Sequence, residues 1–200
     1  MNILVGVTLR QEDCLSYKEK RDQLDICFYP LLKVCNIVPV LIPNDEDIVK
    51  EYLSRIEFSG FILTGGGLPF PYSGCRTTRD SVEKILIEYS LLRDLPVLGI
   101  CRGMQALGVY FDAKLVKVEG HVGVKHKVKT ESGEIRIKNS FHLFSIKEGN
   151  ELIQVNRLAE DGVVEAVVNK KNKVYGIMWH PERMDIYDED DIEFIHNIFK

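Results

Sequence analysis

The first half of the chain alternates short apolar runs with longer amphipathic segments, and this alternation restricts the fold more than any other feature. The apolar runs predict buried strands at residues 3–7, 37–42, 60–64 and 97–100. Between them, apolar side chains at helical spacing predict helices at residues 17–35, 45–55 and 80–93, with Asn44 as the N-cap of the second. Strands and helices in this order form right-handed βαβ units, so we expect a parallel sheet with helices on both faces.

The pattern changes after about residue 113 and becomes richer in β-like runs. These runs cover residues 114–118, 122–129, 133–137, 163–168 and 173–178, and the stretch 188–199 predicts a helix. We therefore expect a small antiparallel extension in the second half, with the main sheet resumed near residues 173–178. With 200 residues and neither a repeat nor a long linker, the chain is expected to form one domain.

Composition and charge exclude several classes of function. The formal net charge is -4 with both signs interspersed, which argues against a nucleic-acid partner. No apolar run approaches the ~20 residues that span a bilayer, and the first residues do not resemble a signal peptide. The five cysteines include no Cys-x-x-Cys pair, which disfavours disulfide or metal frameworks and favours a reducing cytoplasm.

One cysteine lies in a context that suits a nucleophile. Cys101 follows an apolar strand and precedes a helical pattern, and glycines stand two positions to either side, at Gly99 and Gly103. This arrangement is typical of a sharp strand-to-helix turn that exposes a nucleophile at the positive end of a helix, where thiolate is favoured. The turn also leaves the backbone N–H of Arg102 free to bind an oxyanion. A buried structural cysteine is the alternative.

A candidate base follows the last predicted strand. His180 is followed by Pro181 and Glu182, so a carboxylate two residues away can turn back onto the imidazole and fix its tautomer. The alternative is a histidine of an ordinary surface loop, but the Pro-Glu that follows favours a base with its orienting acceptor.

A glycine run follows the strand at residues 60–64. Gly65, Gly66 and Gly67 allow backbone N–H groups to face a ligand without side chains in the way. In a parallel sheet this loop opens at the same edge as Cys101, so we expect the N–H groups of Gly66 and Arg102 to form an oxyanion hole. A plain tight turn is the alternative, while a phosphate-binding loop would need the Gly-Lys-Ser/Thr ending that is missing.

Together these segments resemble the class I glutamine amidotransferases, and within them the γ-glutamyl-γ-aminobutyrate hydrolase branch, in which the domain stands alone. The resemblance spans nearly the whole chain, and its most specific segments are residues 60–66, 96–105, 139–142, 159–166 and 179–182. It implies a flavodoxin-like α/β fold over residues 1–200, with an open, mostly parallel sheet between two layers of helices.

The resemblance also implies roles for matching residues. Cys101 is expected to attack the γ-carbonyl of a glutamine-like substrate, His180 to move the protons and Glu182 to orient His180. Residues expected to line the γ-glutamyl site are Gln105, Gly65, Asn139, Ser140, Phe141 and His142. Glu165 is expected to be structural, and the chemistry requires no metal and no cofactor.

Departures from the family pattern leave the leaving amine open. The loop at residues 68–72, which borders the expected pocket, differs from its usual form. The amine can resemble γ-aminobutyrate or be a nucleotide amidate or phosphoramidate. A glutaminase subunit that delivers ammonia to a separate synthase is the alternative function, and a binding module without activity is a third. The role of the Arg102 side chain and the oligomeric state, a homo-oligomer included, also stay open.

Overall fold

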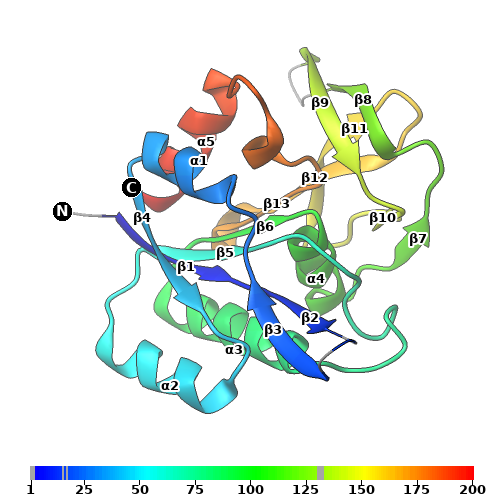
Figure 1. The fold of residues 1–200 in the computed structure, drawn as a ribbon. Helices are drawn as coiled ribbons and strands as arrows, with labels where there is room; N and C mark the ends of the chain where they lie inside the picture. The colour runs from blue at the N-terminus through cyan, green and yellow to red at the C-terminus, as the bar shows by residue number, and fades with distance from the viewer. Residues whose placement is uncertain (1–2, 15, 17, 130–132) are drawn as a thin grey trace.

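The computed structural model describes residues 3–14, 16, 18–129 and 133–200, which build a nine-stranded mixed sheet (Figure 1). Its parallel part contains, in spatial order, β4 (Ile37–Ile42), β1 (Ile3–Thr8), β5 (Gly60–Leu63), β6 (Val97–Ile100) and β13 (Val174–Ile177). The antiparallel part continues with β12 (Val164–Asn169), β11 (Gln154–Ala159), β8 (Val122–Lys129) and β9 (Ile135–Phe141). The predicted antiparallel extension and the return of the sheet at β13 are confirmed.

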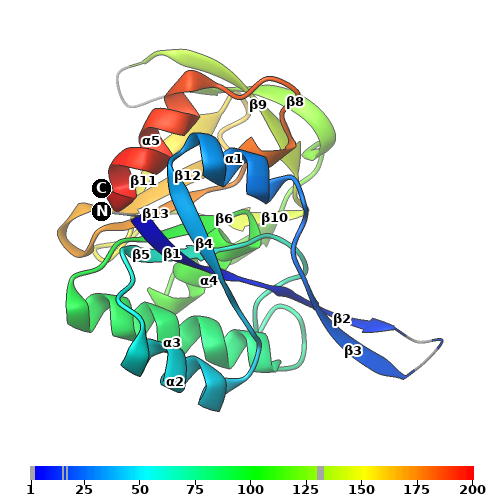
Figure 2. The ribbon, with the colours of Figure 1, turned by 60° about the vertical axis from the view of Figure 1, so that its left-hand side comes forward.

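Helices cover both faces of the parallel strands, as predicted (Figure 2). One face carries α1 (Phe28–Val34) and α5 (Glu189–Phe199), and the other carries α2 (Glu46–Arg55), α3 (Thr78–Arg93) and α4 (Arg102–Tyr110). The central strands are therefore buried on both sides, which explains their continuous apolar runs. Within the described ranges, no helix has the length and apolar character needed to cross a membrane.

The helix predicted at residues 17–35 is wrong in its first half. A hairpin of β2 (Arg10–Cys14) and β3 (Glu19–Gln23) projects from the sheet there, and only α1 is helical. Every residue of β3 is exposed and polar, so this stretch has no apolar face with which a helix could pack. The periodicity came from the apolar residues after residue 23, where the chain turns into α1.

Other boundaries also differ from the prediction. Asp45, not Asn44, caps α2, and its carboxylate accepts the N–H groups of Asp47 and Ile48. The amide of Asn44 instead donates to the carbonyl of Leu9 at 3.1 Å. The last strand of the main sheet ends at Ile177, one residue before the predicted end at residue 178. The pattern also missed β11 and the short strand β10 (Phe144–Ile146), which pairs with β7 (Leu115–Lys117).

Glycines allow α4 to pack directly against the ends of β5 and β6. A side chain on Gly99 would overlap the backbone of Gly103, and a side chain on Gly103 would overlap the carbonyl of Leu63. These are backbone contacts, so no rotamer change can relieve them. The two glycines thus fix the turn that carries Cys101 against the neighbouring strand.

We predict that Gly103→Ala destabilises the protein by about 3 kcal/mol or more, because the new methyl group meets backbone. The matched control is Gly108→Ala on the same helix, where the added methyl meets the end of the flexible Ile146 side chain. Urea unfolding followed by circular dichroism measures both variants. Equal losses in the two variants would contradict the packing argument.

Candidate functional site

A cavity of about 600 Å³ opens at the carboxyl ends of three adjacent parallel strands. Gly66 follows β5, Cys101 follows β6 and His180 follows β13, and all three residues line it. This edge of an open α/β sheet is where such folds bind ligands. The other lining residues are Arg10, Gly67, Leu68, Tyr72, Ser73, Gln105, Phe141, His142, Leu143, Phe144 and Arg183.

Cys101 occupies a strained turn between β6 and α4. Its backbone has φ 53° and ψ -105°, in the positive-φ region that side chains other than glycine rarely adopt. The turn is held because the N–H of Cys101 donates to the carbonyl of Ile177 at 2.7 Å. Cys101 is only 8% exposed, and it lines the cavity.

His180 is held at both its ring and its backbone. Nδ1 of the ring lies 2.6 Å from Oε1 of Glu182, which belongs to the 3₁₀ turn η2 (Pro181–Arg183). The side chain of Asn139 on β9 accepts the backbone N–H of His180 at 2.8 Å and donates to its carbonyl at 2.7 Å. With Nδ1 engaged by the carboxylate, Nε2 is the nitrogen left for another partner.

Cys101 and His180 meet beside Gly65. A Cβ placed on Gly65 would lie 3.7 Å from both Cβ of Cys101 and Nε2 of His180. Burial opposes charge on the ring, but hydrogen bonds with Cys101 and Glu182 outweigh it and raise the pKa of His180 to about 9. The arrangement therefore favours an imidazolium next to the sulfur.

Arg79 on α3 organises the glycine loop from behind. Its guanidinium donates to the carbonyls of Thr64, Gly65 and Gly66, at 2.6, 3.1 and 3.0 Å. In a trans peptide the N–H points opposite to the C=O, so the N–H of Gly66 points away from Arg79. A buried side chain thus sets the direction of the amide that was predicted for the oxyanion hole.

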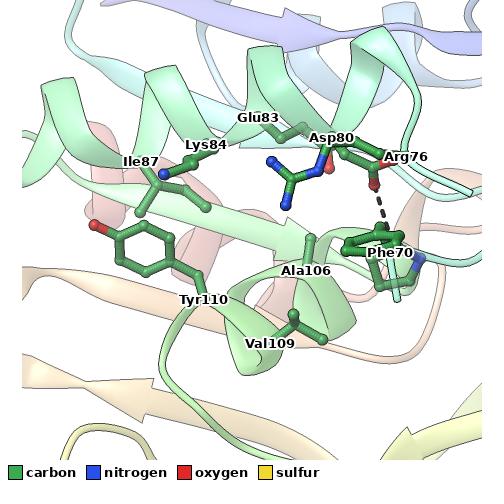
Figure 3. A pocket seen from close by; sticks show the side chains of 10 residues that line it. Phe70, Arg76, Asp80, Glu83, Lys84, Ile87, Ala106, Val109 and Tyr110 are labelled. Carbon is green, nitrogen blue, oxygen red and sulfur yellow. Dashed lines mark hydrogen bonds between the residues drawn. The ribbon is translucent and has the colours of Figure 1, made fainter. Parts of the chain in front are cut away.

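The Arg102 side chain joins the same buried network and does not line the cavity. It pairs with Glu83 and donates to Asp80 at 2.7 Å, while Glu83 also accepts from Arg79 at 2.8 Å. Figure 3 shows Asp80 and Glu83 beside a separate cavity of about 120 Å³ between α3 and α4, which Cys101 does not line. The sequence left the role of the Arg102 side chain open. The structure shows that its guanidinium packs behind the turn that carries Cys101.

The remaining predicted site residues divide into two groups. Gln105, Phe141 and His142 line the cavity, and Oε1 of Gln105 is buried without a hydrogen-bond partner in the described part of the chain. Asn139 instead holds His180, and the hydroxyl of Ser140 donates to the carbonyl of His121 at 2.8 Å. Their placement therefore gives no support to direct substrate contacts by Asn139 and Ser140.

Several features of the site escaped the sequence analysis. Arg79 was not identified, and Asn139 was expected to line the γ-glutamyl site rather than to hold His180. Both side chains act on backbone that lies far away in the sequence, so no local spacing marks these roles. Arg10 and Arg183 line the cavity, and the guanidinium of Arg183 lies 5.2 Å from the ring centroid of Phe141. Arg183 directly follows Glu182, so its place beside the predicted triad was the one available signal.

The chain is similar in sequence to several known proteins. Residues 3–182 match the sequence family described as peptidase C26. The γ-glutamyl-CDP-amidate hydrolase of Campylobacter jejuni is 36% identical over 187 residues, which cover 90% of this chain and 90% of that protein. One of the subunits of the glutamine-hydrolysing GMP synthase of Methanothrix thermoacetophila is 30% identical over 190 residues, covering 91% and 89%.

Solved structures share the fold at low sequence identity. PurLQS of Thermotoga maritima superimposes with a TM-score of 0.69 and 17% identity, covering 100% of this chain and 98% of that one. A glutamine amidotransferase of the same organism gives a TM-score of 0.66 with 16% identity, covering 91% and 77%. These neighbours confirm the predicted flavodoxin-like α/β class.

We predict that Glu83→Gln lowers the free energy of unfolding by about 3–5 kcal/mol, because it leaves the buried Arg79 and Arg102 without their shared carboxylate. The matched control is Glu88→Gln on the same helix, whose exposed pair with Lys84 is worth at most about 1 kcal/mol. Urea unfolding measures both. A Glu83 variant as stable as the Glu88 variant would contradict a supporting role for the network.

Proposed function

This chain belongs to the peptidase C26 family of class I glutamine amidotransferase-like proteins, and we propose that it hydrolyses the amide bond of a small γ-glutamyl compound. Glutamate and an amine or amidate are the products. The observation that carries the proposal is the bond between His180 and Glu182 next to Cys101, at the mouth of one cavity. This arrangement has the form of a nucleophile, a base and an orienting carboxylate.

In the first half of the reaction, the sulfur of Cys101 attacks the γ-carbonyl carbon. Negative charge develops on the carbonyl oxygen, and the N–H groups of Gly66 and Arg102 stabilise it. The imidazolium of His180 gives its proton to the departing nitrogen as the C–N bond breaks. A γ-glutamyl thioester on Cys101 and a free amine result.

In the second half, water replaces the amine. Neutral His180 takes a proton from this water, whose oxygen attacks the thioester carbonyl. The C–S bond breaks, glutamate leaves and the thiolate–imidazolium pair is restored. Glu182 holds the ring in one tautomer through both halves. Oε1 of Gln105, which has no partner among the described residues, accepts a hydrogen bond from the α-ammonium group of the substrate.

Charge at the cavity favours a phosphate-bearing leaving group. Arg10 and Arg183 line the cavity with side chains 53% and 36% exposed. Arg10 pairs with Glu12, and Nε of Arg183 lies 3.4 Å from Asp25, but each guanidinium has five N–H donors, so further donors remain for an anion. The similarity to the γ-glutamyl-CDP-amidate hydrolase of Campylobacter jejuni supports the same choice. Of the two leaving groups open at the start, we therefore propose the nucleotide amidate rather than γ-aminobutyrate.

The second candidate function is a glutaminase subunit that passes ammonia to a separate synthase. The similarity to the GMP synthase subunit of Methanothrix thermoacetophila favours it. This candidate predicts weak activity alone and strong activation by a partner. A steady-state rate on a γ-glutamyl amidate that needs no second protein separates the two functions.

We predict that the purified chain releases glutamate from γ-glutamyl-CDP-amidate faster than from γ-glutamyl-γ-aminobutyrate or glutamine. Cys101→Ser should lower this rate by about four orders of magnitude or more. The control is Cys14→Ser on the β2–β3 hairpin, which should keep the full rate. Equal rates for the Cys101 variant and the parent protein would rule out the proposed nucleophile, while a preference for glutamine would rule out the proposed substrate.

The pKa of His180 predicts how thioester formation depends on pH. The pKa is raised from 6.5 to about 9, so the ring holds the proton for the leaving nitrogen up to that pH and loses it above. Single-turnover acylation by an amide substrate should fall as the pH rises through about 9.

Two comparisons make the pH experiment specific. An activated γ-glutamyl ester, whose leaving group needs no proton, should keep its rate above this pH. Glu182→Gln should move the fall to lower pH, because the lost carboxylate charge no longer stabilises the imidazolium. Identical profiles for amide and ester would contradict proton donation by His180.

A further inference from the structure

Three imidazole rings surround one buried carboxylate in the antiparallel part of the sheet. Glu165 on β12 is 0% exposed, and its Oε1 lies 3.3 Å from Nδ1 of His121 and 3.2 Å from Nε2 of His142. Its other oxygen, Oε2, lies 3.4 Å from Nε2 of His126 on β8. Neither Oε2 of Glu165 nor Nε2 of His126 has a hydrogen-bond partner in the described ranges.

The hydrogen bonds of His121 fix which of its nitrogens carries a proton. Nε2 lies 2.9 Å from Oδ2 of Asp161, an acceptor, so this nitrogen carries the proton of the neutral ring. Nδ1 then presents a lone pair to Glu165. The hydroxyl of Ser140, 3.4 Å from Nδ1, supplies no proton to it, because that proton is already donated to the carbonyl of His121.

The hydrogen bonds of His142, which directly follows β9, fix the position of its proton in the same way. Its Nδ1 lies 3.2 Å from the carbonyl oxygen of Phe144, so Nδ1 carries the proton of the neutral ring. Nε2 then also presents a lone pair to Oε1 of Glu165. Two nitrogen lone pairs and a carboxylate oxygen thus face one another between three buried side chains.

Such a group of acceptors requires a positive charge between them. The three ligand atoms lie within 4.8 Å of one another, and the two contacts with Glu165, at 3.3 and 3.2 Å, have the length of two edges of a tetrahedral site. Zinc bonds of 2.0–2.2 Å to nitrogen and oxygen at the tetrahedral angle separate neighbouring ligand atoms by about 3.3 Å. The bonds of His121 to a carboxylate and of His142 to a carbonyl are those that orient metal-bound histidines.

We propose that His121, His142 and Glu165 bind a divalent transition-metal ion, for which Zn²⁺ is the best match. Nε2 of His126, which lies 3.4 Å from the other oxygen of Glu165, is a candidate for a fourth ligand. In the sequence, the spacing of the cysteines was used to look for metal sites. It could not identify these ligands, since they are imidazoles and a carboxylate from separate segments. The expectation that catalysis needs no metal is unaffected, because no step of the proposed hydrolysis passes through this ion.

The metal links three separate parts of the structure. It joins the segment before β8, the residue that follows β9 and the start of β12. Phe141 and Leu143, the neighbours of His142 in the chain, form part of the cavity wall. The ion therefore holds this wall in place, as a structural site rather than a catalytic one.

Protonation of both histidines is the competing explanation. It would place two imidazolium rings with centroids 4.8 Å apart around one carboxylate. Glu165 and Asp161 would balance the two charges, as they would balance a divalent metal ion, so net charge does not separate the two explanations. A bound metal satisfies all three lone pairs at once, and metal content separates the two explanations.

The first experiment measures zinc in tag-free protein after loading with Zn²⁺ and desalting. We expect about one zinc ion per chain in the parent protein and in Cys101→Ser, and less than about a tenth of that in Glu165→Gln. Cys101→Ser is needed because Cys101 and His180 offer a second thiolate–imidazole pair. Zinc lost in Cys101→Ser but kept in Glu165→Gln would overturn the proposal, and so would a parent protein that binds none.

A second experiment on the parent protein stands even if Glu165→Gln fails to fold. X-ray absorption at the zinc edge should show nitrogen and oxygen ligands only, whereas a sulfur ligand at about 2.3 Å would place the metal on a cysteine and overturn the proposal. Neither measurement involves turnover, so this proposal and the proposed hydrolysis can fail separately.

The hydrogen bond between Asp161 and His121 allows a test in which a supporting contact is removed and the zinc ligands are kept. Asp161→Ala should weaken zinc binding by about 10–100-fold, measured by competition with a chromophoric chelator. His196→Gln on α5, a histidine outside the group, should leave the affinity unchanged. Equal affinities in the two variants would contradict the role assigned to His121.

Discussion

Close backbone packing around Cys101 is the constraint on which the rest of the site depends. Gly99 and Gly103 let α4 lie against the ends of β5 and β6, and this contact forces Cys101 into a positive-φ turn. Because β5, β6 and β13 are parallel neighbours, their ends bring the glycine loop, the sulfur and His180 to one edge. The sheet therefore positions three segments that are far apart in the sequence, and no flexible element has to close to bring them together.

Buried polar side chains then fix the directions of backbone groups at the site, which the sheet alone does not determine. Arg79 holds three successive carbonyls of the glycine loop, and Asn139 holds the peptide groups of His180. Each of these side chains forms hydrogen bonds with backbone from another element, so buried polar contacts support the glycine loop and His180. Such support suits a reaction whose charge develops on an oxygen and must meet donors already in place.

The sequence predicted the central strands, and it indicated Cys101, His180 and Glu182 as the expected triad, because these signals are local. Apolar runs mark β5, β6 and β13, flanking glycines mark Cys101, and the Pro-Glu that follows marks His180. The β2–β3 hairpin escaped because its strands are polar and exposed, so only cross-strand pairing defines them. The roles of Arg79 and Asn139, and the group around Glu165, escaped for a related reason: each depends on contacts between residues distant in the sequence, which neither periodicity nor spacing records.

The central claim is that the sulfur of Cys101 becomes covalently attached to the γ-glutamyl group during turnover. Acid quenching during the reaction, followed by peptide mass spectrometry, tests it directly, because the chain carries four other cysteines as internal controls. The account predicts a γ-glutamyl adduct on the peptide that contains Cys101 and on none of the other four cysteines. Turnover with an adduct on another cysteine, or with no adduct under conditions that trap thioesters, would contradict it.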